Sequence, residues 1–173
     1  TWVYTTEGEL PFQEYFVRRQ CQPQVTGFRF EGAETAHPAP GVLEALAEAD
    51  LVVVCPSNPW VSIDPILAVP GLQAAVNAKT AVAVSPIIGG QTVKGPAAKM
   101  FDELGIAPSA LSVAQHYRGW VAGMVIDRID AELADPIREL GMEVLTTDTI
   151  MKTAYDRARL AKEVIDFGLR ILR

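Results

Sequence analysis

The chain has 173 residues, of which 49% are hydrophobic and 21% are charged, and its formal net charge is −6 at pH 7. This length and composition are ordinary for one soluble domain with a sizeable core. The negative charge argues against a surface that holds a nucleic-acid backbone, because neutralising phosphates requires clustered Lys and Arg. We therefore expect a single α/β domain over residues 1–173 and no nucleic-acid partner.

Cysteine usage and hydropathy argue against two further classes of protein. The two cysteines, Cys21 and Cys55, form neither a disulfide framework nor a metal-ligand spacing. No apolar run approaches the length of a membrane span, and the first residues lack a basic region followed by an apolar one. We therefore expect a cytoplasmic protein with no membrane partner.

Short elements are predicted over the first 50 residues from apolar spacing and from the positions of Gly and Pro. They are a strand at 2–5, a turn at 7–9, a helix at 13–19, a strand at 25–30, a loop at 33–40 and a helix at 41–49.

The next strand, at residues 51–55, is the one around which we expect the fold to be organised. Its residues are apolar and mostly β-branched without alternation, which is typical of a strand covered on both faces of a parallel sheet. Ser57, Asn58 and Ser62 follow it. In open parallel sheets ligands bind beyond the carboxyl ends of the strands, where loops present free amides. The alternative is a tight turn with Ser62 as the cap of the next helix.

A second strand, at residues 81–84, ends in a similar loop of small residues that begins with Ser85. Gly89, Gly90 and Gly95 permit positive φ or a close approach to a ligand. Lys94 offers a cation for a phosphate. The alternative is a loop that only needs to turn and a solvated surface lysine.

The remaining chain continues the alternation of helix and strand. We expect helices at 72–78, 96–104, 109–117 and 131–140, strands at 123–127 and 142–145, and a last helix that opens with a Thr153–Asp156 capping box. Asp127 and Asp130 follow a strand, where capping a helix is a commoner role than catalysis. The pattern predicts an α/β three-layer sandwich with a mostly parallel Rossmann-like sheet.

Several segments resemble the 2-phospho-L-lactate transferases of coenzyme F-420 biosynthesis. The resemblance rests mainly on the two loops, 56–67 and 82–97, with weaker similarity at 12–16, 113–117 and 147–151. Members of that family are about twice an ordinary domain in length, so the chain resembles their carboxyl-terminal portion. The family's glycine-rich first turn and its metal-holding acidic residues have no counterpart here.

The resemblance implies a specific reaction. A phospholactyl, phosphoenolpyruvyl or phosphoglyceryl unit moves from a guanosine diphospho-linked donor to the ribityl hydroxyl of 7,8-didemethyl-8-hydroxy-5-deazariboflavin, and GMP is released. Such a reaction fits the lack of a recognisable nucleophile–base motif, because the substrates supply the attacking hydroxyl and the leaving group. The catalytic residues are unknown. Mg²⁺ is the expected cofactor, with its ligands outside this chain, so the chain alone is expected to be inactive.

The resemblance also implies the site residues. Those expected to line the nucleotide or phosphate site are Ser57, Asn58, Pro59, Ser62, Ser85, Gly89, Gly90, Lys94 and Gly95. Trp60 is either a core residue or an aromatic wall for the planar deazaflavin acceptor, and we favour the wall because of the family's acceptor. A homodimer is a further expectation.

Two other functions compete with the transferase. One is a regulatory protein that binds a nucleotide sugar without turnover, as in the related family of morphogenesis and gluconeogenesis factors. The other is an inactive structural half that pairs with the rest of a longer chain. Binding of guanosine diphosphate rather than a uridine diphosphate-sugar distinguishes the transferase from the regulator.

Overall fold

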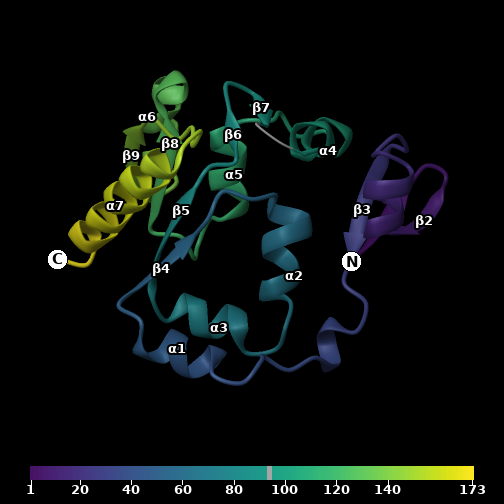
Figure 1. Cartoon of the computed structure of the whole chain (residues 1–173), viewed down its shortest axis with the longest axis horizontal. Coiled ribbons are helices and arrows are strands. Elements are labelled where there is room, and N and C mark those ends of the chain that lie inside the picture. Colours follow the sequence, from purple (N-terminus) through teal and green to yellow (C-terminus); the bar gives the residue numbers. More distant parts are fainter. Residues whose placement is uncertain (93–94) are drawn as a thin grey trace.

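The structure is a computed structural model that describes residues 1–92 and 95–173. Its main sheet has four parallel strands in the order β4-β5-β8-β9 (Figure 1). These strands are β4 (Leu51–Val54), β5 (Thr80–Val84), β8 (Gly123–Asp127) and β9 (Glu143–Thr147). The two central strands are almost wholly buried, as expected where helices cover both faces of a sheet. The predicted α/β fold is confirmed.

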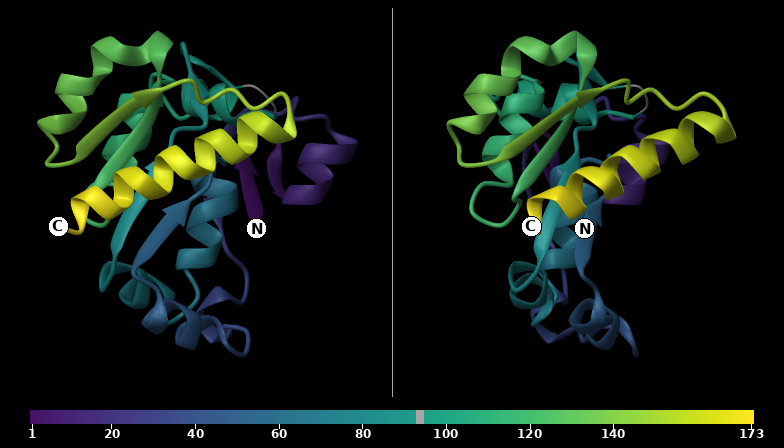
Figure 2. Two further views of the ribbon diagram at one scale, coloured as in Figure 1. Left: turned by 60° about the vertical axis from the view of Figure 1, so that its left-hand side comes forward. Right: turned by 90° about the vertical axis from the view of Figure 1, so that its left-hand side faces the viewer.

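The sheet lies between two layers of helices. Alternate residues of β5 pack against the two layers of helices, because successive side chains along a strand point to opposite faces of the sheet. Val82 and Val84 pack with Leu160, Val164 and Phe167 of the long helix α7 (Ala154–Ile171). The other face carries the larger core cluster, which extends into the amino-terminal segment. Figure 2 shows α7 lying obliquely across one face of the sheet.

The first strands form a separate sheet. Its antiparallel order is β2-β1-β3, with β1 (Trp2–Thr5), β2 (Gly8–Pro11) and β3 (Val25–Arg29). The predicted strands at 2–5 and 25–30 therefore lie outside the parallel sheet. Of the predicted turn at 7–9, residues 8 and 9 already belong to β2. Only two residues join β1 to β2, a connection that produces a hairpin, whereas parallel pairing needs a longer crossover.

This small sheet packs against the rest of the molecule through α4 (Ala97–Glu103) and the segment after β4 (Figure 1). The backbone N–H of Val25 donates to Glu103 Oε2 at 3.0 Å. The Phe28 ring stacks on Trp60 at 6.2 Å between centroids. The amino-terminal segment thus forms one wall beside the carboxyl edge of the parallel sheet.

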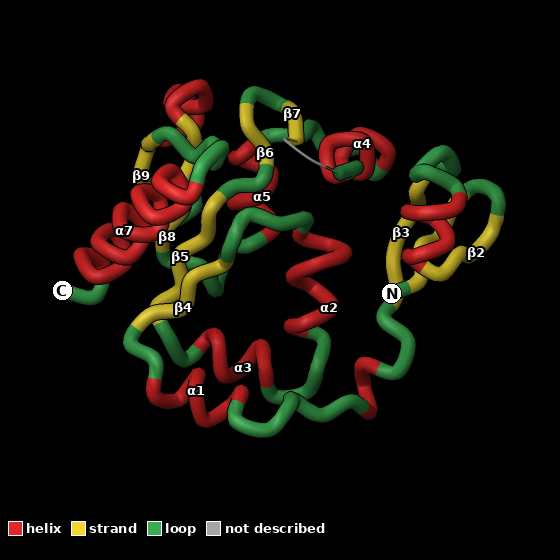
Figure 3. Tube along the Cα trace, viewed as in Figure 1, coloured by secondary structure: helices red, strands yellow, loops and turns green. Residues whose placement is uncertain are grey.

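The remaining elements are short (Figure 3). The helices are α1 (Val42–Glu48), α2 (Asp64–Leu67), α3 (Leu72–Asn77), α5 (Ala110–His116) and α6 (Ala134–Arg138). The tighter or wider turns are η1 (Glu14–Arg18), η2 (Ala33–Thr35), η3 (Pro59–Ile63) and η4 (Arg128–Leu133), and β6 (Ile87–Ile88) pairs with β7 (Gln91–Thr92). None of the helices in the described ranges is long and apolar enough to cross a membrane.

The capping box predicted for the last helix is present. The Thr153 hydroxyl accepts from the Asp156 backbone N–H at 3.2 Å, and the Asp156 carboxylate accepts from the Thr153 backbone N–H at 2.7 Å. The two bonds satisfy donors that otherwise have no partner at a helix start.

Candidate functional site

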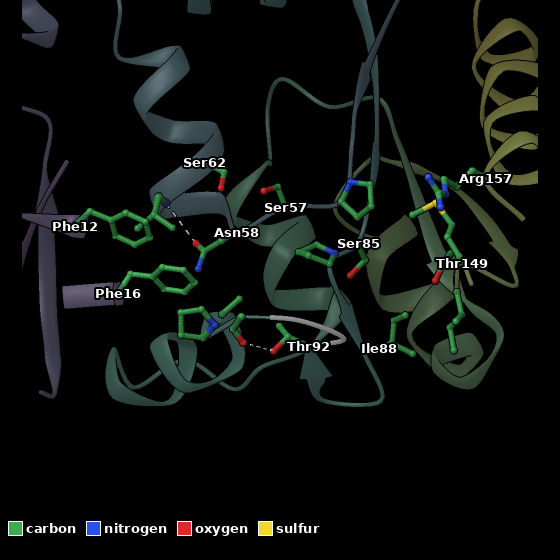
Figure 4. Close-up of a pocket in the computed structure, with 18 residues that line it drawn as sticks. Phe12, Phe16, Ser57, Asn58, Ser62, Ser85, Ile88, Thr92, Thr149 and Arg157 are labelled. Carbon is green, nitrogen blue, oxygen red and sulfur yellow. Dashed lines mark hydrogen bonds between the residues drawn. The ribbon is translucent and has the colours of Figure 1, made fainter. Parts of the chain in front are cut away.

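A pocket of about 640 Å³ opens at the carboxyl edge of the parallel sheet. Its walls come from the amino-terminal segment, the loops after β4 and β5, the start of α4, and the segment between β9 and α7. Figure 4 shows two phenyl rings, Phe12 and Phe16, at one end of the pocket and Thr149 with Arg157 at the other. Ser57 and Ser85 lie between these ends.

The loop after β4 contributes Ser57, Asn58 and Ser62 to the pocket, as the sequence predicted for their position. Asn58, not Ser62, caps the following turn: its Oδ1 accepts from the backbone N–H of Trp60 at 3.0 Å. Its amide group also donates to the Met100 sulfur at 3.2 Å. Asn58 is therefore held rigidly, whereas the hydroxyls of Ser57 and Ser62 have no partner among the hydrogen bonds of the described residues.

Pro59 is buried at the first position of η3 and does not line the pocket, contrary to expectation. A proline suits this position because it lacks the N–H that a helix start leaves unpaired.

The loop after β5 is held by side-chain hydrogen bonds at Ser85 and at Gly89. The Ser85 hydroxyl donates to the Ile87 carbonyl at 2.9 Å and accepts from the Ile87 N–H at 3.2 Å, so this pocket-lining serine already has local partners. Gly89 and Gly90 have φ of +55° and +74° and form the two-residue turn between β6 and β7. A turn with two positive φ values favours glycine at both positions.

These glycines do not frame the pocket, which corrects the expectation for them. The Gly89 N–H donates to the Asp130 carboxylate at 3.0 Å, so this amide is not free for a phosphate. Gly95 does line the pocket. Lys94 lies outside the described residues.

Asp127 and Asp130 hold pocket loops in place. Asp127 Oδ1 accepts from the Ile129 N–H at 3.1 Å and caps η4, as predicted. Its Oδ2 accepts from the Thr149 N–H at 2.8 Å and from the Thr149 hydroxyl at 3.0 Å, which fixes the segment that lines the pocket after β9. Asp130 fixes the β6–β7 turn through Gly89.

The two carboxylates have opposite pKa shifts. Burial raises the pKa of Asp127, but the hydrogen bonds from Thr149 and Ile129 outweigh it, so the pKa is lowered overall. Burial raises the pKa of Asp130, and the Gly89 amide offsets only part of that effect. Asp127 has more hydrogen-bond donors and the positive charge of Arg128 nearby, whereas the negative charges of Glu132 and Asp127 raise the pKa of Asp130 further.

Trp60 belongs to the core and is not a wall for the acceptor. Its side chain is 9% exposed, and its ring lies 4.3 Å from Phe101 and 6.2 Å from Phe28 between centroids. An indole contributes most to stability when its large apolar surface is buried, and here it joins the amino-terminal sheet to α4.

His116 forms a pair with Asp64 beside this core. Its Nε2 lies 2.9 Å from Asp64 Oδ1, and its ring meets Trp60 edge-on at 5.8 Å. Neither residue of the pair lines the pocket, so the pair links α2 to α5 and adds nothing to the site.

The aromatic side chains that line the pocket are instead those of Phe12 and Phe16. Their rings stack at 5.5 Å between centroids with an angle of 11° between planes. Phe16 is 41% exposed. Sequence reasoning did not assign them to the site; residues 12–16 contributed only a weaker part of the family resemblance.

Arg157 is a second residue that the sequence did not assign. It lines the pocket from the first turns of α7 and is exposed. Within residues 1–92 and 95–173 the ion pairs do not include it, so its guanidinium is available to an anion. A guanidinium suits phosphate oxygens because it can donate two parallel hydrogen bonds.

The described residues do not form a metal site. They contain no group of three or more His, Cys, Asp or Glu side chains able to hold an ion. Asp127 and Asp130, the best-placed carboxylates, already accept backbone amides. The ligands of Mg²⁺ therefore remain an expectation for residues outside this chain.

The parallel sheet defines a Rossmann-like α/β protein, and its pocket lies at the carboxyl edge, where proteins of that class bind ligands. A family model described as 2-phospho-L-lactate transferase CofD matches residues 1–165, and the chain belongs to this family.

Relatives agree with this assignment. The chain is 42% identical to a 2-phospho-L-lactate transferase of Methanopyrus kandleri, over 95% of the chain and 53% of that protein. It is 39% identical to a 2-phospho-L-lactate transferase of Methanocaldococcus jannaschii, over 91% of the chain and 50% of that protein. It is also 42% identical to a phosphoenolpyruvate transferase of Thermobifida fusca, over 94% of the chain and 49% of that protein. The chain thus spans about half the length of the curated relatives it matches.

Solved structures support the fold alone. A Bacillus halodurans protein of the UPF0052 family superposes with a TM-score of 0.57 at 17% identity, over 92% of this chain and 57% of that one. A second crystal structure of the same Bacillus halodurans protein gives a TM-score of 0.60 at 16% identity, over 95% of this chain and 58% of that one.

Proposed function

We propose that the pocket binds the reactants of a CofD-type transfer, in which a phospho-acid unit passes from a guanosine diphospho-linked donor to a deazaflavin during coenzyme F-420 biosynthesis. The observation that carries this proposal is the shape of one continuous pocket, with stacked phenyl rings at one end and an arginine at the other. Family membership supplies the reaction class.

The two ends suit different parts of the reactants. Phe12 and Phe16 offer a flat apolar surface for the deazaflavin ring, since aromatic rings stack favourably. The hydroxyls of Ser57 and Ser62, which line the same pocket, offer hydrogen bonds to the ribityl chain. Arg157 provides the positive charge that a phosphate requires. An acceptor held this way directs its terminal hydroxyl toward the anionic end.

In this reaction the pocket residues position the two reactants and stabilise negative charge. The acceptor hydroxyl attacks the phosphorus that carries the acid, the bond to the GMP phosphate breaks, and the hydroxyl proton is lost to solvent or a base. Holding the two reactants in line converts a bimolecular step into an effectively unimolecular one. The relatives' names include both phospholactate and phosphoenolpyruvate transferases, so the acid of the donor stays open.

Deazaflavin binding tests the aromatic end. Phe16→Ala removes half of the stacked pair, and we expect it to weaken acceptor binding about tenfold, as loss of one ring contact of about 1–1.5 kcal/mol predicts. Ile66→Ala, at an exposed apolar residue outside the pocket, is the matched control. Quenching of deazaflavin fluorescence measures both. Equal affinities in the two variants contradict this role for the phenyl rings.

Nucleotide binding tests the cationic end of the pocket. It also distinguishes the transferase from the regulatory protein that binds a nucleotide sugar. Arg157→Met should reduce affinity for guanosine diphosphate in low salt, and the reduction should shrink as salt is raised. Arg118→Met, an exposed arginine outside the pocket, is the control. Calorimetry with a uridine diphosphate-sugar runs in parallel. Tighter binding of the sugar nucleotide contradicts the transferase and favours the regulatory protein.

A further inference from the structure

The phenyl rings of the pocket lie next to a turn of unusual backbone conformation. Phe16 belongs to η1, a wide turn in which the Arg19 N–H donates to the Glu14 carbonyl, five residues earlier, at 2.9 Å. Such wide turns are rare and are frequent at functional sites. The chain then passes through Gln20 and Cys21, which have φ of +49° and +60°. Two successive left-handed residues that are not glycine are strained, so the surrounding structure must hold them.

Tyr15 holds this turn from the interior of the protein. Its side chain is completely buried in the larger core cluster, whereas Phe12 and Phe16 on either side of it line the pocket. The Tyr15 carbonyl accepts from the Cys21 N–H at 2.9 Å, and the Tyr15 hydroxyl donates to the Cys21 carbonyl at 3.4 Å. Both backbone groups of one strained residue are therefore bonded to Tyr15.

Two side chains of α4 hold the segment that follows the turn. Lys99 Nζ donates to the Pro23 carbonyl at 3.3 Å and lies 6.0 Å from the centroid of the Tyr15 ring. Lys99 also forms an ion pair with Glu103, one helical turn further on. Glu103 Oε2 accepts from the Val25 N–H at 3.0 Å. The connection between the strained turn and β3 is thus bonded to α4 through a carbonyl and an amide.

The same helix forms part of the pocket. Pro96 and Ala97, at the start of α4, line it, and Lys99 and Glu103 follow on the next turns. Figure 1 shows α4 between the β6–β7 hairpin and the amino-terminal strands. We call Tyr15, Lys99 and Glu103 the clamp, because together they join the segment that carries the phenyl rings to a helix that lines the pocket.

We propose that the clamp positions the phenyl pair for the acceptor, so that Tyr15, Lys99 and Glu103 are positioning residues that act on deazaflavin binding through Phe16. None of the three lines the pocket. Stacking between aromatic rings depends on their offset and separation, and a displaced Phe16 ring therefore binds the acceptor less tightly. This inference rests on the proposed function, because it takes the phenyl pair as the surface that receives the deazaflavin.

A clamp that only stabilised the fold would affect every ligand alike. The clamp lies at the phenyl end of the site, whereas Thr149 and Arg157 come from the opposite end (Figure 4). Loss of the clamp should therefore weaken deazaflavin binding and leave the affinity for guanosine diphosphate nearly unchanged.

Substitution of Lys99 tests this difference. Lys99→Met keeps most of the stem but removes the charge and the bond to Pro23, and we expect it to weaken deazaflavin binding about fivefold in fluorescence quenching. Calorimetry should show guanosine diphosphate affinity within about twofold of the wild type. Lys99→Arg keeps a cationic donor and should restore deazaflavin affinity to within about twofold. Equal losses for the two ligands, or no loss for deazaflavin, overturn the proposal.

The matched control is Lys162→Met. Lys162 forms an ion pair with Asp166 at the same i, i+4 spacing, but on an exposed part of α7 outside the pocket. The control should bind both ligands within about twofold of the wild type, as a solvated ion pair contributes little. A loss of deazaflavin affinity equal to that of Lys99→Met overturns the proposal.

A double-mutant cycle tests whether the clamp acts through Phe16. In a chain that carries Phe16→Ala, Lys99→Met should change deazaflavin affinity by less than about twofold, because the ring to be positioned is gone. Two losses that multiply show that Lys99 acts independently of the ring, and this result overturns the proposal.

Gln20 tests the strained turn without a change in the core, because its side chain is exposed. Gln20→Gly suits a positive φ and should keep deazaflavin affinity within about twofold of the wild type. Gln20→Val introduces a β-branched residue, which strongly disfavours this φ, and should weaken binding about fivefold. Equal affinities in the two variants contradict a role for the turn.

Failure of the proposed function gives a different pattern. If the wild type does not bind deazaflavin, or if Phe16→Ala binds it as tightly as the wild type, the proposed function and the clamp are both overturned. If Phe16→Ala binds weakly while Lys99→Met binds normally, the clamp alone is overturned.

Discussion

Asp127 and Asp130 lie three residues apart at one end of β8, and each holds a different loop of the pocket. Asp127 accepts three hydrogen bonds and Asp130 accepts from one amide. A buried carboxylate remains ionised where donors compensate the loss of water, and becomes easier to protonate where they do not. The pair therefore allows a matched comparison of two buried acids in one environment.

Asp127→Asn should destabilise the protein at pH 7. The amide keeps one acceptor oxygen, so either Ile129 or Thr149 faces an NH₂ group and loses its partner. We expect the free energy of unfolding to fall by about 2 kcal/mol, as for a hydrogen bond to a charged group. Urea denaturation measures the loss. Asp135→Asn, at an exposed ion pair, should change it by less than about 0.5 kcal/mol.

Asp130 should produce the opposite dependence on pH. Its folded pKa is raised, so its unfolded form loses a proton first, and stability falls as pH rises from about 3.9 toward the folded pKa. For Asp127 the folded pKa is lowered, and its contribution is complete above about 3.9 and lost as pH falls below that value.

Asp130→Asn keeps an oxygen for the Gly89 amide and cannot ionise. The variant should therefore gain stability relative to the wild type between pH 4 and pH 7, measured as the difference of the two unfolding free energies at each pH. A difference that stays constant over this range contradicts the raised pKa.

At the scale of elements, the close approach of α7 to the sheet depends on small residues. A Cβ on Gly123 of β8 would lie 2.8 Å from the Phe167 ring and 2.6 Å from the Ile171 side chain. A Cβ on Gly168 of α7 would lie 2.4 Å from Leu51. At these two points α7 therefore lies closer to the sheet than it could if the glycines carried a β-carbon.

Gly123→Ala should displace the Phe167 ring and cost about 1–3 kcal/mol of unfolding free energy, as overpacking of a core does. Phe167→Leu in the same chain replaces the ring by a smaller side chain and should recover part of the loss. A double-mutant cycle measured by urea denaturation gives the coupling between the two positions. Full additivity of the two substitutions shows that the contact does not govern the packing.

At the scale of the whole molecule, we expect the transfer to depend on Mg²⁺ held by residues outside this chain. The described residues place serine hydroxyls at the pocket, but they include no group of three or more His, Cys, Asp or Glu side chains able to hold a metal ion. We predict that the 173 residues bind deazaflavin but turn over at a rate lower by a factor on the order of a thousand or more than the full-length 2-phospho-L-lactate transferase of Methanopyrus kandleri.

The assay incubates donor, acceptor and Mg²⁺ with each chain and follows the phosphodiester product by mass. Comparable turnover in the two chains shows that the catalytic groups lie within these residues. Absence of deazaflavin binding contradicts the proposed site independently of turnover.

The four parallel strands, the long last helix with its capping box, and the two serine-containing loops could be predicted from the sequence. These features depend on local patterns: runs of β-branched residues, helical spacing, and the pairing of Thr153 with Asp156. The position of Ser57 and Asn58 at the carboxyl edge followed from the direction of parallel strands. Their part in binding remains a prediction.

Only the tertiary structure decided which side chains meet in the pocket. Phe12, Phe16 and Arg157 come from the two ends of the chain, and no local pattern relates them. Trp60 follows a strand end, where an aromatic side chain could bind a planar ligand. In the structure it packs between Phe28 and Phe101, which are distant in sequence. The apolar pattern of β4 correctly predicts a strand, but whether both its edges are paired depends on long-range contacts, because backbone pairing partners leave no mark within the strand itself.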